Sequence, residues 1–76
     1  MKITDILKQD LKHNEVLAEN HNGLISKYEK IKNNQYKVVE SYYPANNIIT
    51  GKYEIKDYLN GLIYGLNEIN IIRDAN

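Results

Sequence analysis

The spacing of apolar residues between Ile55 and Leu66 constrains the fold of this chain more than any other feature. Polar side chains alternate with apolar ones at helical intervals, and in an α-helix the apolar ones would share one face. The apolar positions are Ile55, Tyr58, Leu59, Leu62, Ile63 and Leu66. The pattern predicts an amphipathic C-terminal helix that forms the centre of the core, with Leu62 buried in it.

A shorter helix is predicted near the N-terminus, over residues 4–12. The hydroxyl group of Thr4 can accept hydrogen bonds from the free N–H groups of the first turn. Asp5 lies where the helix dipole favours a negative charge. The apolar side of this helix is formed by Ile3, Ile6, Leu7 and Leu11.

Two turn signals divide the middle of the chain. Asn22-Gly23 is a strong hairpin signal because both residue types tolerate positive φ, and Asn33-Asn34 marks a second turn. The residues from Tyr36 to Tyr43 are mostly β-branched or aromatic, as is usual in strands. The segment therefore predicts a three-stranded antiparallel meander that ends at Pro44, which has no N–H group for the ladder.

A helical interpretation of the same segment stays open. The apolar residues between Leu24 and Ile31 also have helical spacing, and Gly23 would then be the C-cap of a helix. The sequence thus predicts one small α+β domain over residues 1–76, in which a short N-terminal helix, a three-stranded antiparallel meander and the amphipathic C-terminal helix follow in order. The alternative is a mostly α fold with a β-hairpin wing.

Two flanking segments are less defined. Residues 48–50 are expected to form a short edge strand before the C-terminal helix. Beyond Leu66, Ile69 and Ile72 would extend the helix, whereas the alternation in residues 69–71 fits a strand.

Charge and composition exclude several classes of protein. Ten basic and ten acidic side chains cancel, whereas a non-specific nucleic-acid binder is usually basic and a DNA mimic strongly acidic. There is no cysteine for disulfides or Cys-based zinc sites. Because the chain has neither a signal-peptide pattern nor an apolar run of about 20 residues, we expect a cytoplasmic protein without a membrane partner. Ile, Asn, Lys and Tyr have AT-rich codons and make up half of the chain, which indicates a low-GC bacterium or one of its phages.

No group of residues predicts catalysis, a cofactor or a metal site. His13 and His21 would lie about 12 Å apart on a continuous helix, too far to share an ion, and no third ligand is evident. Ser26 and Ser41 lack the flanking glycines of a nucleophile elbow. We therefore expect this protein not to be an enzyme.

One local group of lysines is a candidate nucleic-acid site. It consists of Lys27, Lys30, Lys32 and Lys37, interleaved with Tyr28 and Tyr36. The lysines could hold a phosphate backbone while the tyrosines stack on bases. The alternative is a solvated hairpin whose lysines prevent edge-to-edge aggregation.

The seven tyrosines, in a chain without Phe or Trp, suggest a protein interface. Tyrosine combines apolar area with a hydroxyl group and is enriched in interface cores. The interface candidates are Tyr28, Tyr36, Tyr42 and Tyr43. Since side chains alternate along a strand, one of Tyr42 and Tyr43 should face the core and the other a protein partner or a second copy of the chain.

The order of predicted elements resembles the small anti-CRISPR proteins of Gram-positive phages, some of which are αβββα inhibitors of Cas9. The resemblance involves the helix start at Met1–Leu7 and the stretch Tyr58–Leu66, which includes Gly61 and Gly65. It implies a phage or mobile-element protein that binds and inhibits a host protein such as a CRISPR effector. Those inhibitors are acidic DNA mimics and this chain is neutral, so a steric block or dimer formation is the expected mechanism. The rival interpretation is a small winged-helix or excisionase-like regulator that binds DNA.

Overall fold

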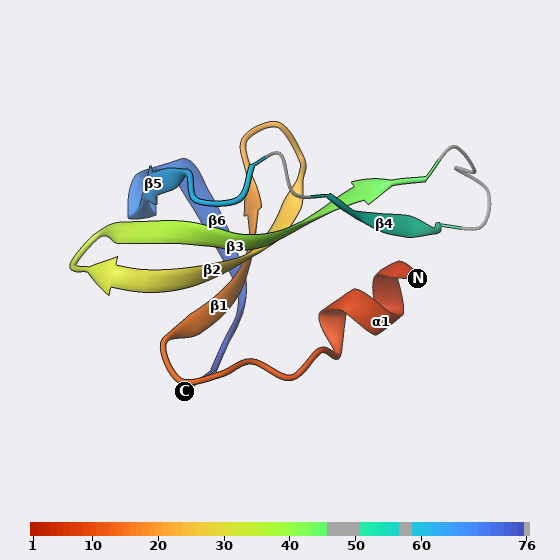
Figure 1. Cartoon of the computed structure of the whole chain (residues 1–76), viewed down its shortest axis with the longest axis horizontal. Helices are drawn as coiled ribbons and strands as arrows, with labels where there is room; N and C mark the ends of the chain where they lie inside the picture. The colour runs from red at the N-terminus through yellow and green to blue at the C-terminus, as the bar shows by residue number, and fades with distance from the viewer. Residues whose placement is uncertain (46–50, 57–58, 76) are drawn as a thin grey trace.

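The computed structural model describes residues 1–45, 51–56 and 59–75 of the chain. In this part of the chain, six antiparallel strands form one sheet, and one short α-helix accompanies them (Figure 1). The elements are α1 (Ile3–Leu7), β1 (Glu15–Asn20), β2 (Ile25–Lys32), β3 (Gln35–Pro44), β4 (Tyr53–Lys56), β5 (Ile63–Gly65), the 3₁₀-helix η1 (Leu66–Glu68) and β6 (Ile69–Asp74).

The sheet is arranged around β3, its longest strand. The strand order is β4-β3-β2-β1-β6, and β5 also pairs with β3. One edge of β3 is paired with β2, while β5 and β4 share its other edge, β5 at residues 35–37 and β4 at residues 41–44. In Figure 1 the two short strands accordingly lie at opposite ends of β3.

A β-bulge at Val39 lets β3 contribute to both faces of the sheet. Lys27 pairs with Glu40 and the next residue of β2, Tyr28, pairs with Val38, so Val39 is an extra residue on β3. Such an extra residue shifts the alternation of side chains by one position. Tyr36 and Val38 before the bulge therefore face one cluster of buried residues, and Tyr42 after it faces the other.

The first cluster is formed by residues of β1, β2, β3 and β6. Its buried members are Val16, Ala18, Tyr28, Tyr36, Val38 and Ile69, and Leu59 and Tyr64 pack against them. The rings of Tyr28 and Tyr64 meet edge to face, with centroids 5.8 Å apart. Aromatic rings favour this geometry because the positive edge of one meets the negative face of the other.

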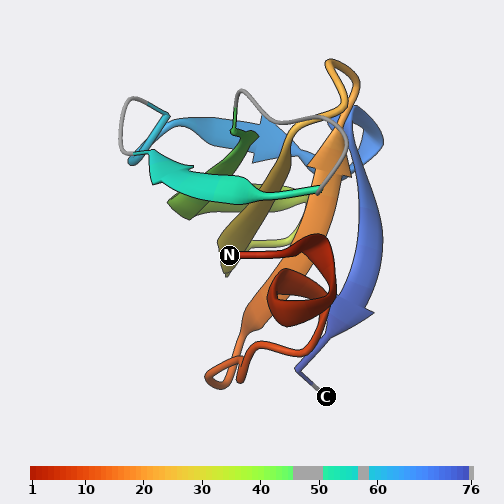
Figure 2. The same ribbon diagram turned by 90° about the vertical axis from the view of Figure 1, so that its right-hand side faces the viewer.

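The second cluster is covered by the N-terminal segment. Ile6, Leu17, Ile25 and Tyr42 are its buried members, with Ile3, Leu11 and Tyr53 beside them. Figure 2 shows α1 in front of β1 with β6 alongside. Since a helix of five residues is not stable alone, its place on Leu17 and Ile25 explains why it forms.

The predicted C-terminal helix is wrong. Its residues form β4 and β5, two strands on one edge of β3, with a turn at residues 59–61 between them. Gly61 has φ +88°, which an α-helix does not allow. Leu62 is 47% exposed and is not a core residue. The predicted core position of Tyr58 and the predicted strand at residues 48–50 lie outside the described residues.

Other elements agree better with the sequence. The three strands of the predicted meander are β1, β2 and β3, and β3 ends at Pro44, so the helical-hairpin alternative is wrong. The strand interpretation of the tail is confirmed by β6. The N-terminal helix is shorter than predicted and its N-cap is Lys2 rather than Thr4, although the Asp5 side chain does accept a hydrogen bond from the Lys2 backbone, at 3.1 Å.

Candidate protein-binding site at the β2–β3 hairpin tip

Three of the four tyrosines proposed as interface residues are buried in the sheet. Tyr28 and Tyr42 have no exposed surface and Tyr36 is 6% exposed. Tyr43 is half-buried, so the expected alternation between Tyr42 and Tyr43 is found, with Tyr42 as the inward residue. Tyr28 and Tyr36 therefore cannot stack on bases, and Tyr43 alone of the four retains a surface for a partner.

The four candidate lysines separate into three places. Lys27 lies on the face of the second cluster and forms an ion pair with Glu40, with 3.6 Å between Nζ and Oε2. Lys37 is half-buried and pairs in register with Glu29 on one side and Ile63 on the other. Lys30 and Lys32 are both exposed at the end of β2.

Lys30 and Lys32 line one hollow at the tip of the β2–β3 hairpin. Its volume is about 250 Å³, and the lining residues are Asn14, Lys30, Ile31, Lys32 and Asn33. The backbone N–H of Lys30 donates to the backbone oxygen of Asn14, at 2.9 Å, which ties the hairpin to the segment before β1. Asn14 has φ +68°, a left-handed conformation that asparagine tolerates better than most residues. The hairpin-tip site is defined here by these five residues.

The hairpin-tip site combines an apolar side chain with positive charge. Ile31 is 40% exposed and stands between the two lysines in the chain. Ile31 lines the same hollow as the two lysines, so an acidic group bound there would also lie near apolar surface. This is chemistry that suits an acidic protein segment with an apolar side chain.

A second hollow adjoins the hairpin turn. Asn34, Leu66 and Asn67 line about 500 Å³ between the turn and η1. The backbone N–H of Leu66 donates to the backbone oxygen of Asn34, at 3.2 Å. This hydrogen bond fixes the start of η1 against the hairpin turn. Leu66 is 41% exposed in it. Leu66 is the apolar residue of this second hollow, which it shares with Asn34 and Asn67.

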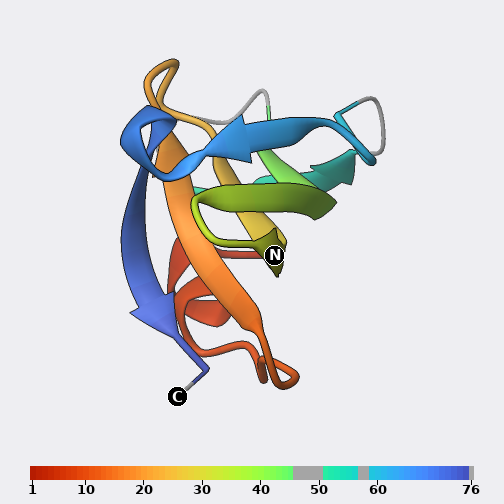
Figure 3. The ribbon, with the colours of Figure 1, turned by 90° about the vertical axis from the view of Figure 1, so that its left-hand side faces the viewer.

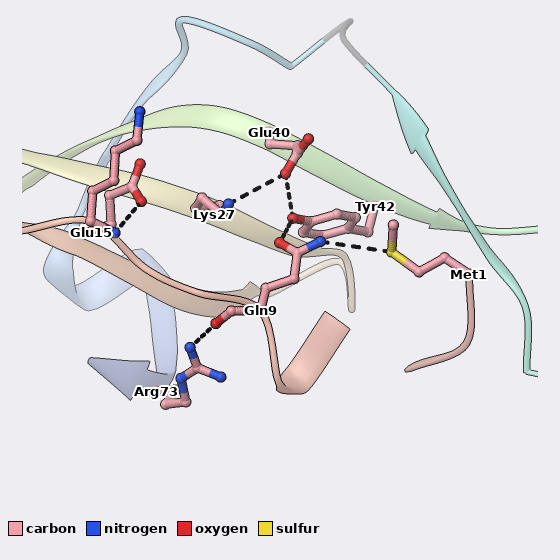
Figure 4. Close-up of polar contacts among 8 residues, drawn as sticks. Met1, Gln9, Glu15, Lys27, Glu40, Tyr42 and Arg73 are labelled. Atoms are coloured by element: carbon pink, nitrogen blue, oxygen red, sulfur yellow. Dashed lines mark hydrogen bonds and ion pairs between the residues drawn. The ribbon is translucent and has the colours of Figure 1, made fainter. Parts of the chain in front are cut away.

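A polar network on the other face holds the N-terminal segment in place (Figure 4). The hydroxyl group of Tyr42 lies between the side-chain amide oxygen of Gln9 and the carboxylate of Glu40. The guanidinium group of Arg73 donates to the backbone oxygens of Leu7 and Gln9. These contacts connect β3 and β6 to the end of α1, so we assign the network a structural role.

The hollow next to this network carries charges of both signs. It has a volume of about 240 Å³ and is lined by Asp10, Lys12, Glu15, Lys27, Val39 and Glu40. The carboxylate of Glu15 accepts a hydrogen bond from the backbone N–H of Lys12, at 2.7 Å. Glu40 is already paired with Lys27. Three of its five charged side chains, Glu15, Lys27 and Glu40, thus have partners within the chain, and the charges of both signs favour no single charged ligand.

Two buried tyrosines have raised pKa values. Burial raises the pKa of Tyr28 to about 12. Burial, followed by the hydrogen bond and the negative charge of Glu40, raises the pKa of Tyr42 further. Both side chains are therefore protonated at neutral pH.

His13 and His21 are both exposed. In the part of the chain that the structure describes, no three His, Asp or Glu side chains lie close enough to hold an ion.

The two serines, Ser26 and Ser41, are fully buried, and their hydroxyl oxygens lie 3.3 Å apart.

Among the described residues, no helix is both long and apolar enough to cross a membrane.

Sequence reasoning placed Lys30 and Lys32 together but did not identify their neighbours. Ile31, Asn14 and Asn33 complete the hairpin-tip site. The turn signal at Asn33-Asn34 could have indicated that Ile31 lies at a hairpin end, where its side chain has few neighbours. The contact with Asn14 could not be foreseen, because it depends on how β1 pairs with β2.

The comparisons with known proteins leave the family open: no family model, no curated protein and no solved structure matches the chain.

Proposed function

We propose that this protein is a small binding module that attaches to a larger host protein through the hairpin-tip site. The observation that carries the proposal is that the exposed Ile31 and two exposed lysines line one surface hollow together with Asn14 and Asn33. The partner that fits this chemistry is a protein segment with acidic side chains next to an apolar one. Attachment would inhibit the partner by covering its surface, without catalysis.

Burial of the tyrosines favours a protein over a nucleic acid as the partner. Single-stranded nucleic acids are usually held by lysines together with exposed aromatic rings. Tyr28 and Tyr36 are in the core, and Lys27 is paired with Glu40. Two exposed lysines in a chain of zero net charge make a small electrostatic footprint for a phosphate backbone.

We keep the expectation that this is a phage or mobile-element protein. We do not keep the alternative of a winged-helix regulator that binds DNA. That regulator required helices in the segment that forms β1 and β2. The αβββα layout behind the anti-CRISPR resemblance is also absent, since the C-terminal part of the chain forms strands. A steric block of a host protein remains the proposed mode of action.

The test is a charge reversal with a matched control. The variant Lys30→Glu/Lys32→Glu changes the hairpin tip, and Lys8→Glu/Lys52→Glu makes the same change of charge at two other exposed lysines. Binding of a synthetic peptide with alternating Asp and Leu residues is followed by NMR chemical shifts. We expect shifts at residues 14 and 30–33 that disappear in the hairpin-tip variant and persist in the control.

The competing outcome is binding of nucleic acid. A short duplex DNA titrated under the same conditions should cause no comparable shifts at about 0.15 M salt. Tighter binding of the duplex than of the peptide, or equal loss of peptide binding in both variants, would overturn the proposal. In a host lysate, capture of a protein partner should be insensitive to nuclease and lost in the hairpin-tip variant alone.

A further inference from the structure

Three strands of the described sheet have an edge that no other strand covers: β4, β5 and β6. Exposed edges pair readily with other chains unless charge, a bulge or a covering segment protects them. The edges of β4 and β6 have such protection, and the edge of β5 does not.

Two of the edges are protected. The start of β4 is covered by the N-terminus, since the backbone N–H of Tyr53 donates to the Met1 oxygen and that of Ile3 donates to the Gly51 oxygen. In β6, Ile72 is an extra residue opposite the step from Leu17 to Ala18. This bulge disturbs the edge of β6, and the charged residues 73–74 follow it.

Among the described residues, the edge of β5 has no covering segment, bulge or charge of this kind. Figure 3 shows β5 with β3 along one edge and no strand along the other. Its pairing with β3 has no bulge, and residues 61–66 contain no charge. Leu62, Ile63 and Leu66 are 47%, 55% and 41% exposed. An uncharged, regular edge flanked by exposed apolar side chains is suited to accept another strand.

The direction of the backbone groups of β5 follows from its bonds to β3. The oxygen of Leu62 accepts from the N–H of Val38, and the N–H of Leu66 donates to the oxygen of Asn34. Backbone groups alternate in direction along a strand, so Tyr64 also points toward β3. The N–H and C=O groups of Ile63 and Gly65 therefore point to the open edge.

We propose that a second copy of this chain pairs with this edge, β5 against β5 in antiparallel orientation about a twofold axis at Tyr64. A twofold interface requires that the surface be complementary to itself. Here Ile63 of each copy pairs with Gly65 of the other. The outward N–H and C=O groups of these residues therefore form hydrogen bonds on both sides of the twofold axis. Leu62 then lies opposite Leu66 of the other copy, which covers both exposed leucines.

Charge agrees with this arrangement. Lys37 lies next to Ile63 on the neighbouring strand, and Glu68 follows Gly65 in η1. Pairing Ile63 with Gly65 brings Lys37 of one copy toward Glu68 of the other, on both sides of the axis. Since the chain has zero net charge, two copies do not repel each other overall. The strand is short, so we expect a weak dimer with less than about 1,200 Å² of buried surface.

The register can be tested by disulfide trapping, because the chain has no cysteine of its own. Opposed residues of a non-hydrogen-bonded antiparallel pair have Cα atoms about 4.5 Å apart, which a disulfide can span. The variants Leu62→Cys and Leu66→Cys are oxidised separately and as a mixture. We expect the mixed disulfide in at least about tenfold excess over either homodimer, a ratio that corresponds to about 1.4 kcal/mol. A mixed disulfide in only the twofold excess over each homodimer that random pairing gives, or no product, would overturn the proposal.

A second variant tests the edge independently. Ile63→Pro removes an N–H group that points away from β3, so the fold should persist while the dimer seen by sedimentation equilibrium is lost. A dimer of Ile63→Pro as stable as that of the unsubstituted chain would contradict the pairing. The Lys30→Glu/Lys32→Glu variant should give the same disulfide pattern, so failure of the hairpin-tip proposal and failure of this one are distinguishable.

Discussion

The hydroxyl group of Tyr42 lies 2.5 Å from a carboxylate oxygen of Glu40, two residues before it on the same strand. Residues two apart on a strand share a face, which is why the two side chains meet. The Gln9 amide, from the segment after α1, contacts the same hydroxyl group. One side chain thus both packs in the second cluster and connects the N-terminal segment to the sheet.

The first prediction concerns this hydroxyl group. Tyr42→Phe keeps the ring but removes the hydroxyl group that contacts Gln9 and Glu40, so it should lower the free energy of unfolding by about 1–3 kcal/mol, although Glu40 keeps its ion pair with Lys27. Urea denaturation measures the change. Tyr53→Phe, in the same cluster, is the control and should change stability by less than about 0.5 kcal/mol. Equal effects of the two variants would show that the network does not stabilise the fold.

The second prediction is a loss of stability at alkaline pH. An unfolded tyrosine has a pKa of about 10, whereas that of Tyr28 is about 12 and that of Tyr42 is raised further. Above pH 10 the unfolded chain therefore binds fewer protons than the folded one, and stability falls as pH rises. Each tyrosine contributes up to about 1.4 kcal/mol per pH unit. Urea denaturation at several pH values measures this slope, which Tyr28→Phe should reduce.

The third prediction compares two leucines. Leu17 has no exposed surface, so Leu17→Ala should cost about 2–5 kcal/mol. Leu62 is 47% exposed, and Leu62→Ala should cost less than about 1 kcal/mol. Thermal unfolding at low protein concentration measures both without a contribution from dimers. A larger loss of stability for Leu62→Ala than for Leu17→Ala would mean that Leu62 is a core residue, which would contradict the strand assignment of β5.

The fourth prediction concerns the buried pair Ser26 and Ser41. Either serine replaced by alanine leaves the other hydroxyl group buried without its partner, at a cost of about 1–3 kcal/mol. The double variant removes both groups and should cost less than the sum of the two single variants. A double-mutant cycle by urea denaturation measures this coupling. Additive costs would mean that the contact at 3.3 Å contributes nothing.

The sequence predicts the meander well because its signals are local. Gly23 has φ +81° and Asn34 has φ +64°, both within the turns that the asparagine-containing pairs indicate. A turn that requires positive φ identifies itself by residue type. The strands on either side then follow from β-branched and aromatic residues, with little need for information from the rest of the chain.

The C-terminal half misleads because helical spacing arises there by coincidence. Apolar residues of β4, of the following turn and of β5 fall at helical intervals only when the segment is read as continuous. The contrary signal was Gly61, in the middle of the predicted helix, whose positive φ makes the turn. Pairing of both strands with β3 is a long-range relationship that local periodicity does not contain.

The hairpin-tip site was partly accessible from the sequence. Lys30 and Lys32 are adjacent to a predicted turn, and a turn exposes the side chains around it. The tyrosines were misplaced because residue type alone does not separate a buried tyrosine from an interface tyrosine. In a small domain without Phe or Trp, Tyr28 and Tyr42 take the core positions that those residues would otherwise fill.

The bulge at Val39 has a consequence for how this protein can change in evolution. The residues of β3 on its two sides face different clusters only because one extra residue separates them. Deletion of Val39 would turn Tyr42 to the opposite face, whereas replacement of its half-buried side chain would leave every other residue in place. Natural variants should therefore differ in the identity of residue 39 and keep the number of residues between Tyr36 and Tyr42 constant.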